Sequence, residues 1–227
     1  MTGMIQRMRE RMIRLIYPHD VACLICSGEA DVAPGYGICQ TCSARLPRVT
    51  GELETGGNRA FDALASPFYY ETPLKELIHR FKYSNQRYIA KGLAHYMADA
   101  VREAGWPALH AVVPVPLHEA RRSERGFNQA ALLASEIAQL LEIDLDREAL
   151  VRVRQTKTQT LLDRAERERN VQNAFAVPET ARIEGATLLL VDDVVTTGTT
   201  ADACAKALKA AGAKAVYAVS ACTRTIE

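Results

Sequence analysis

The stretch Leu188-Leu189-Leu190-Val191-Asp192-Asp193-Val194-Val195-Thr196-Thr197-Gly198-Thr199-Thr200 decides the fold of this 227-residue chain. Its apolar run, 188–191, predicts a buried parallel strand, and the two acids then fall at the carboxyl end of that strand, where open α/β sheets bind ligands. The hydroxyl-rich turn at 196–200 opens a helix predicted over 201–211. Backbone N–H groups, hydroxyls and the positive end of that helix together predict a phosphate site.

This order of parts resembles the signature of type I phosphoribosyltransferases. The resemblance implies that Asp192 and Asp193 accept hydrogen bonds from the ribose hydroxyls of phosphoribosyl pyrophosphate (PRPP). It also implies that the turn holds the 5′-phosphate through Thr196, Thr197, Gly198, Thr199 and Thr200. The alternative is an ordinary strand-to-helix turn whose acids cap a helix.

The chain from about residue 61 alternates between strand-like and helix-like segments. We expect strands at 64–70, 111–115 and 215–222, and helices at 73–83, 88–104 and 127–141. With the motif strand and its helix, these segments predict an α/β fold: a mostly parallel sheet flanked by helices, as in type I phosphoribosyltransferases.

Composition sets the class of protein. A content of 48% hydrophobic and 24% charged residues is typical of a soluble globular protein. The net charge of +1 gives no overall attraction to nucleic acid or to an anionic membrane. No apolar run is long enough to span a bilayer, and the segment before Tyr17 lacks the apolar core of a secretory signal, so we expect a cytoplasmic protein.

Two Cys-x-x-Cys pairs, Cys23/Cys26 and Cys39/Cys42, lie either side of a glycine-containing loop. This spacing predicts a tetrahedral site for a structural zinc ion, whereas two disulfides are disfavoured in a reducing cytoplasm. An amphipathic helix is expected ahead of the pairs. We therefore expect two parts: helix and zinc ribbon at 1–55, packed on a phosphoribosyltransferase-like domain at 56–227.

Two basic loops add candidate residues. The first follows the strand 111–115 and corresponds in order to the pyrophosphate loop of phosphoribosyltransferases. Leu117 and His118 are expected to present backbone groups there, while Arg121, Arg122 or Arg125 add charge. A solvated basic surface is the alternative.

The second basic loop, 152–170, resembles the lid that closes over PRPP in this fold, with Lys157 as a candidate cation for the leaving pyrophosphate. A charged, exposed helix at 163–169 is the alternative.

A basic and aromatic cluster lies in the predicted helix 73–83 and just after it: Arg80, Lys82, Tyr83 and Arg87. Such a cluster can neutralise and stack on single-stranded DNA. The more frequent use of long basic side chains is to cover a helix face with their stems while their charges stay in water.

Together these motifs resemble the ComF family of phosphoribosyltransferase-like proteins. The resemblance covers nearly the whole chain and includes 77–83, 114–116, 125–129 and the acid pair. It implies a Mg²⁺-dependent phosphoribosyl transferase with an unnamed acceptor, associated with DNA uptake. Single-stranded DNA and a competence helicase are the implied partners. The alternative is a non-catalytic adaptor that binds PRPP or a nucleotide and contacts DNA or the helicase.

Overall fold

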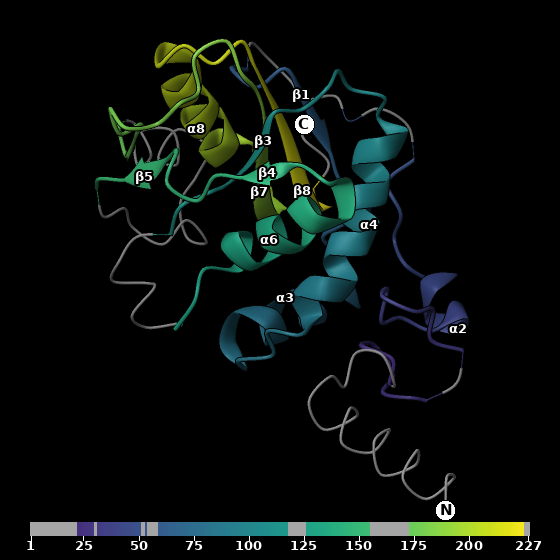
Figure 1. Cartoon of the computed structure of the whole chain (residues 1–227). Coiled ribbons are helices and arrows are strands. Elements are labelled where there is room, and N and C mark those ends of the chain that lie inside the picture. Colours follow the sequence, from purple (N-terminus) through teal and green to yellow (C-terminus); the bar gives the residue numbers. More distant parts are fainter. Residues whose placement is uncertain are drawn as a thin grey trace, which may run out of the picture.

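A computed structural model describes residues 22–29, 31–50, 53, 59–117, 126–154 and 173–224 (Figure 1). Its centre is a parallel sheet in the order β1-β8-β7-β3-β4, with β2 also paired to β8. The strands are β1 (Ala63–Ala65), β2 (Phe68–Tyr69), β3 (Ala111–Pro114), β4 (Asp144–Leu145), β7 (Thr187–Val195) and β8 (Ala215–Thr223). The predicted α/β fold with a mostly parallel sheet is confirmed.

The central strand β7 is buried on both faces, which explains its continuous apolar run. It pairs with β8 from Thr187↔Ala215 to Val195↔Thr223. On its other side it pairs with β3, from Ala111↔Leu188 to Pro114↔Val191. The carboxyl ends of these parallel strands therefore meet at one edge of the sheet.

Three helices cover one face of the sheet: α3 (Leu74–Tyr83), α4 (Ile89–Glu103) and α6 (Gln129–Leu141). All three were predicted, to within two residues at each end. Helix α6 begins where the Asn128 side chain accepts a hydrogen bond from the N–H of Ala130, a standard N-cap contact.

The opposite face carries α8 (Thr199–Ala210) and a small antiparallel pair, β5 (Val151–Arg152) with β6 (Phe175–Ala176). Strands β5 and β6 flank 155–172, which lies outside the described residues. The sequence analysis did not predict β4 or β6, because strands of two residues are too short to show a period.

The strand predicted over 64–70 is in fact two short strands, β1 and β2. Both pair with β8, and Ser66 and Pro67 separate them. Proline has no N–H to donate, so it interrupts a ladder.

The cysteine-containing segment packs on the main body, as expected. It contains a short helix, α2 (Gln40–Ser43), and contributes Leu24, Ile38 and Leu46 to the core that α3 and α4 share. The approach is close: a Cβ at Gly92 of α4 would lie 2.7 Å from the Tyr36 carbonyl oxygen.

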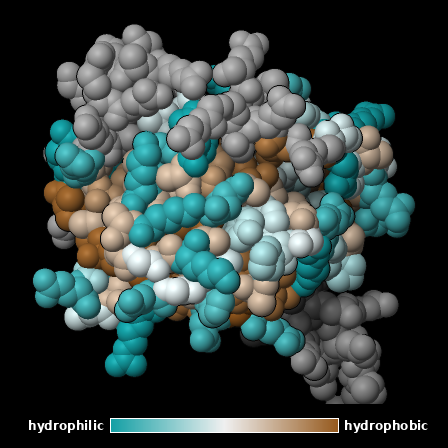
Figure 2. All heavy atoms as spheres, turned by 90° about the horizontal axis from the view of Figure 1, so that it is seen from above, coloured by the Kyte–Doolittle hydropathy of each residue, from teal (hydrophilic) through white to brown (hydrophobic). Residues whose placement is uncertain are grey.

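The face seen from above is of mixed polarity: hydrophilic side chains stand between apolar areas (Figure 2). Within the described parts of the chain, none of the helices has the length and apolarity needed to cross a membrane.

Candidate phosphoribosyl site and cysteine cluster

Strand β7 continues through both acids and ends at Val195, so the acids lie inside the strand rather than after it. The reason is that β8 pairs with β7 beyond the acids, at Val194↔Cys222 and Val195↔Thr223. Both acids still lie near the carboxyl end of the sheet, directly before the turn that leads into α8.

The two acids differ in their surroundings. Successive side chains of a strand point to opposite faces of the sheet. The Asp193 carboxylate lies 2.9 Å from the ammonium of Lys82 on α3, and Asp193 is only 8% exposed. Asp192 is partly exposed, and its Oδ1 accepts a 2.8 Å hydrogen bond from the N–H of Asp193.

The environment of the pair disfavours the ionised form of Asp192. Burial, and then the charge of Asp193, raise the pKa of Asp192 to about 7, although the charges of Lys82 and Arg152 and the N–H of Asp193 act in the opposite direction. Near neutral pH the pair therefore holds its second negative charge weakly. A hydroxyl donor or a cation at this edge would stabilise that charge.

The turn after β7 has the features expected of an anion site. Gly198 has φ of 72°, a left-handed conformation that favours glycine, and it caps α8. The hydroxyls of Thr197 and Thr199 lie 2.8 Å apart. Thr196 and Thr200 are half-buried beside them. Helix α8 begins at Thr199, two residues before the predicted start, so the N–H groups of its first turn fall within the predicted phosphate turn.

A residue that the sequence analysis missed also touches this turn. The guanidinium of Arg59 donates a 2.7 Å hydrogen bond to the carbonyl of Thr197. The N–H of Ala60 donates to the Asp202 carboxylate on α8, also at 2.7 Å. Arg59 and Thr197 are 138 positions apart in the chain, so no local motif could have linked them.

Only part of the predicted pyrophosphate loop is described. Leu117 follows β3 and is half-buried, and the N–H of the nearby Val115 donates to the carbonyl of Val191, so the loop leaves the sheet beside β7. The other predicted residues of the two basic loops lie outside the described residues: His118, Arg121, Arg122, Arg125 and Lys157.

One end of the second basic loop is described. The guanidinium carbon of Arg152 lies 5.4 Å from the centre of the Phe175 ring, and the Arg152 charge lowers the pKa of Asp192. The base of this loop, β5 and β6, therefore lies within electrostatic reach of the acid pair.

The basic and aromatic cluster is divided. Arg80 donates to the carbonyl of Leu24 in the cysteine segment, and Lys82 pairs with Asp193. Arg87 lies 4.8 Å from the centre of the Phe127 ring, whereas Tyr83 is 59% exposed. Tyr83 and Arg87 are therefore exposed, whereas Arg80 and Lys82 are half-buried.

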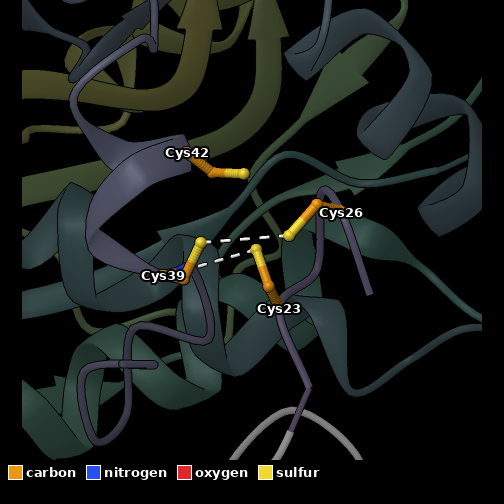
Figure 3. Close-up of side chains that lie close together, drawn as sticks. All are labelled: Cys23, Cys26, Cys39 and Cys42. Carbon is orange, nitrogen blue, oxygen red and sulfur yellow. Dashed lines mark hydrogen bonds between the residues drawn. The ribbon is translucent and has the colours of Figure 1, made fainter. Parts of the chain in front are cut away.

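The four cysteines of the two pairs converge, with all sulfur atoms within 4.8 Å of one another (Figure 3). The sulfurs of Cys26 and Cys39 are 3.9 Å apart. In a tetrahedral site with Zn–S bonds of about 2.3 Å, sulfurs are about 3.8 Å apart. The Cys23 sulfur also accepts hydrogen bonds from the N–H groups of Ile25 and Cys39. The cluster therefore fits a zinc ion.

The thiols of this cluster differ in acidity. Burial works against ionisation of Cys23, but backbone N–H groups outweigh it and lower its pKa to about 7. Burial, followed by hydrogen bonds to the neighbouring thiols, raises the pKa of Cys42 to about 12. Four thiolates cannot coexist here without a cation, and a divalent metal supplies that charge. Cys204 and Cys222, in contrast, are buried core residues outside the cluster, as predicted.

Comparisons with known proteins agree with this geometry. Residues 127–226 match the model of the phosphoribosyl transferase domain family. The chain is similar to DNA utilization protein YhgH of Escherichia coli K12, with 34% identity over 201 residues, covering 80% of this chain and 88% of the relative. It is also similar to competence protein F of Haemophilus influenzae, with 30% identity, covering 86% and 93% of the two chains.

Among solved structures, a purine phosphoribosyltransferase from Pyrococcus horikoshii aligns over 56% of this chain and 69% of its own, with 18% identity and a TM-score of 0.35. A score this low adds nothing to the assignment. The identity over most of the chain and the domain match carry it: this chain belongs to the ComF family and contains a phosphoribosyl transferase domain.

Proposed function

We propose that the protein binds PRPP and transfers its phosphoribosyl group, with Mg²⁺, to an acceptor in a reaction associated with DNA uptake. The observation that carries this proposal is that the acid pair and the Gly198 turn meet at one edge of the sheet, within a phosphoribosyl transferase domain. An edge of this kind can hold a ribose and its phosphate together.

The turn supplies the site for the 5′-phosphate. The first N–H groups of α8 and the hydroxyls of Thr197 and Thr199 converge there, and the helix dipole favours an anion. The bond from the Arg59 guanidinium to the Thr197 carbonyl fixes the turn and brings a positive charge close to it. These contacts suit a phosphate dianion better than a neutral sugar.

The acid pair supplies the site for the ribose. A carboxylate accepts hydrogen bonds from neighbouring hydroxyls, and two such bonds would offset the burial that raises the pKa of Asp192. Ligand binding would therefore favour the ionised acid. Asp192 and Asp193 are the catalytic candidates because they lie closest to the reacting sugar in this arrangement.

In the transfer step, the bond between the sugar C1 and pyrophosphate breaks, and the acceptor nucleophile bonds to C1. Basic side chains assist departure of the pyrophosphate; Arg121 and Lys157 are the catalytic candidates, with His118, Arg122 and Arg125 as further contacts and Leu117 presenting backbone groups. Mg²⁺ brought with PRPP to the edge that carries Asp192 and Asp193 would supply additional charge neutralisation for the leaving pyrophosphate.

The cysteine cluster has a structural role in this proposal. It binds one zinc ion through Cys23, Cys26, Cys39 and Cys42, and this binding supplies most of the free energy that orders the zinc ribbon of the first part, 1–55, which is packed on the domain at 56–227.

A second candidate function is a non-catalytic adaptor that uses PRPP as a signal and contacts single-stranded DNA or a helicase. The exposed ring of Tyr83, four positions before the exposed Arg87 in the chain, favours this reading, and a curated relative is named a DNA utilization protein. Both candidates require the same PRPP site. They differ in turnover and in the direct contact with DNA or a helicase.

Calorimetric titration with Mg²⁺ and PRPP, followed by a pyrophosphate-release assay with bases, amines and single-stranded DNA, tests both candidates. Binding with release supports the transferase, and binding without release supports the adaptor. The double variant Asp192→Asn/Asp193→Asn should stay folded and lose PRPP binding. Unchanged affinity in that variant would rule out the assigned site.

A further inference from the structure

Lys82 was predicted to belong to a DNA-binding cluster, but in the structure it pairs with Asp193 of the acid pair. It lies in the last turn of α3, and its ammonium is 2.9 Å from Asp193 Oδ2. The two side chains are only 20% and 11% exposed. This is therefore not an ordinary surface ion pair, which would be screened by water and contribute little.

Helix α3 is fixed in position by its packing. Its apolar residues Leu74, Leu77, Ile78 and Phe81 are buried in the core. On the side of the cysteine segment, Arg80 donates to the carbonyl of Leu24. Core packing and the Arg80 hydrogen bond therefore both fix the position of α3. The Lys82 ammonium reaches the acid pair from a helix whose backbone is fixed.

The ion pair makes the two acids unequal. Asp193 is nearly buried and already neutralised by Lys82, whereas Asp192 keeps part of its surface exposed. The N–H of Asp193 also donates to Asp192 Oδ1, so the position of Asp193 sets the orientation of Asp192. Removing Lys82 would leave Asp193 as an uncompensated, nearly buried charge, which is strongly unfavourable.

We propose that Lys82 is a positioning residue of the PRPP site: its ammonium fixes the Asp193 carboxylate on the α3 side, so that Asp192 is the acid that receives the ribose hydroxyls. This inference rests on the proposed function and extends it, because it assigns different roles to the two acids.

The test is calorimetric titration with Mg²⁺ and PRPP of wild type, Lys82→Met and Lys82→Arg. Lys75→Met is the matched control, since Lys75 lies on the same helix but is exposed. We expect Lys82→Met to weaken PRPP binding about tenfold or more, as removal of one partner of a buried charged pair does. Lys82→Arg should recover most of the affinity, and Lys75→Met should match wild type.

A double-mutant cycle shows whether Lys82 acts through Asp193. If it does, Lys82→Met/Asp193→Asn should bind PRPP no more weakly than Lys82→Met alone. Effects that simply add would overturn the proposal. Circular dichroism checks the fold. If Lys82→Met does not fold, the variant with a neutral pair, Lys82→Met/Asp193→Asn, is used in its place. Asp192→Asn should then bind PRPP more weakly than this double variant.

The pH profile gives a readout that a merely structural role would not move. Among the residues that the structure describes, the charged and titratable groups that interact with the pair are Lys82, Arg152, Cys204 and Cys222. The Lys82 charge lowers the pKa of Asp192, so without it Asp192 protonates at higher pH, and the affinity ratio of wild type to Lys82→Met should grow as pH falls from 8 to 6. A ratio independent of pH would contradict the proposal.

The titrations distinguish failure of the proposed PRPP site from failure of the role of Lys82. Absence of PRPP binding by wild type would overturn the proposed function itself. Binding by wild type together with equal affinities for Lys82→Met and Lys75→Met would overturn only the role of Lys82.

Discussion

The cysteine segment and the α/β body are held together by different forces. The body buries a continuous set of aliphatic side chains on both faces of β7. The cysteine segment buries only a few apolar residues, and these belong to the same buried cluster as side chains of α4 and Phe68. The body can therefore fold by burial alone, whereas the segment needs both a metal and the body to be ordered.

Helix α3 connects these two regions. Arg80 contacts the cysteine segment and Lys82 contacts the acid pair. A change in either region can therefore reach the other through one short helix. Substitutions in one region should therefore show how far the other depends on it.

The largest effect is expected from Cys39→Ser. Losing one of four thiolates should abolish zinc binding, and structural zinc sites contribute about 10–16 kcal/mol to folding in small peptides. We expect the cysteine segment to become sensitive to protease while hydrogen exchange of the β7 and β8 amides stays slow. Metal analysis should find about one zinc per wild-type chain.

Cys204→Ala serves as the control for this experiment, since Cys204 is buried outside the cluster and its removal should leave zinc content unchanged. Loss of protection in β7 together with zinc would show that the two regions fold as one unit.

The reverse experiment is Leu189→Ala, in the buried centre of β7. A large-to-small substitution at such a site costs about 2–5 kcal/mol. Denaturant unfolding should show that loss, while the zinc content of the folded protein remains that of wild type. A variant that lost zinc under native conditions would contradict the separation of the two regions.

Asp192→Asn should stabilise the ligand-free protein. Because burial and Asp193 raise the pKa of Asp192 to about 7, the folded state binds more protons than the unfolded state between the ordinary carboxyl pKa and that value. Stability therefore falls as pH rises through this window, and the loss is complete above it. Calorimetry should find a melting temperature a few degrees above wild type at pH 8, with little difference at pH 4. Equal shifts at both pH values would be inconsistent with a raised pKa of Asp192 in the folded state.

The smallest effect is expected for Tyr36→Phe, where the cysteine segment meets α4. The Tyr36 hydroxyl donates a 2.6 Å hydrogen bond to Asp99, and this bond, with burial, raises the pKa of Tyr36 to about 12. Its loss should cost about 1 kcal/mol. Thermal melting would detect the change, and a larger loss would mean that this contact, rather than the metal, holds the segment in place.

The sequence predicted the fold better than the site. The period of β7 and of the long helices is local, and so is the spacing of the cysteines, and each led to the structure found. The length of β7 could not be predicted, because its last residues are held by pairing with β8.

Within the site, the acids and the Gly198 turn are contiguous and could be recognised from the sequence. Arg59 and Lys82 reach the same edge from distant segments, and only the tertiary fold brings them there. Lys82 in particular was grouped with its sequence neighbours Arg80 and Tyr83, whereas α3 directs it to Asp193.

The most direct test of the central claim is calorimetric titration with Mg²⁺ and PRPP of wild type and Asp192→Asn side by side. We predict saturable binding at one site per chain by wild type, and binding at least about tenfold weaker by the variant, as expected for the loss of hydrogen bonds to a charged group. No binding by wild type, or equal affinity in the two proteins, would contradict the assignment of this edge as a PRPP site.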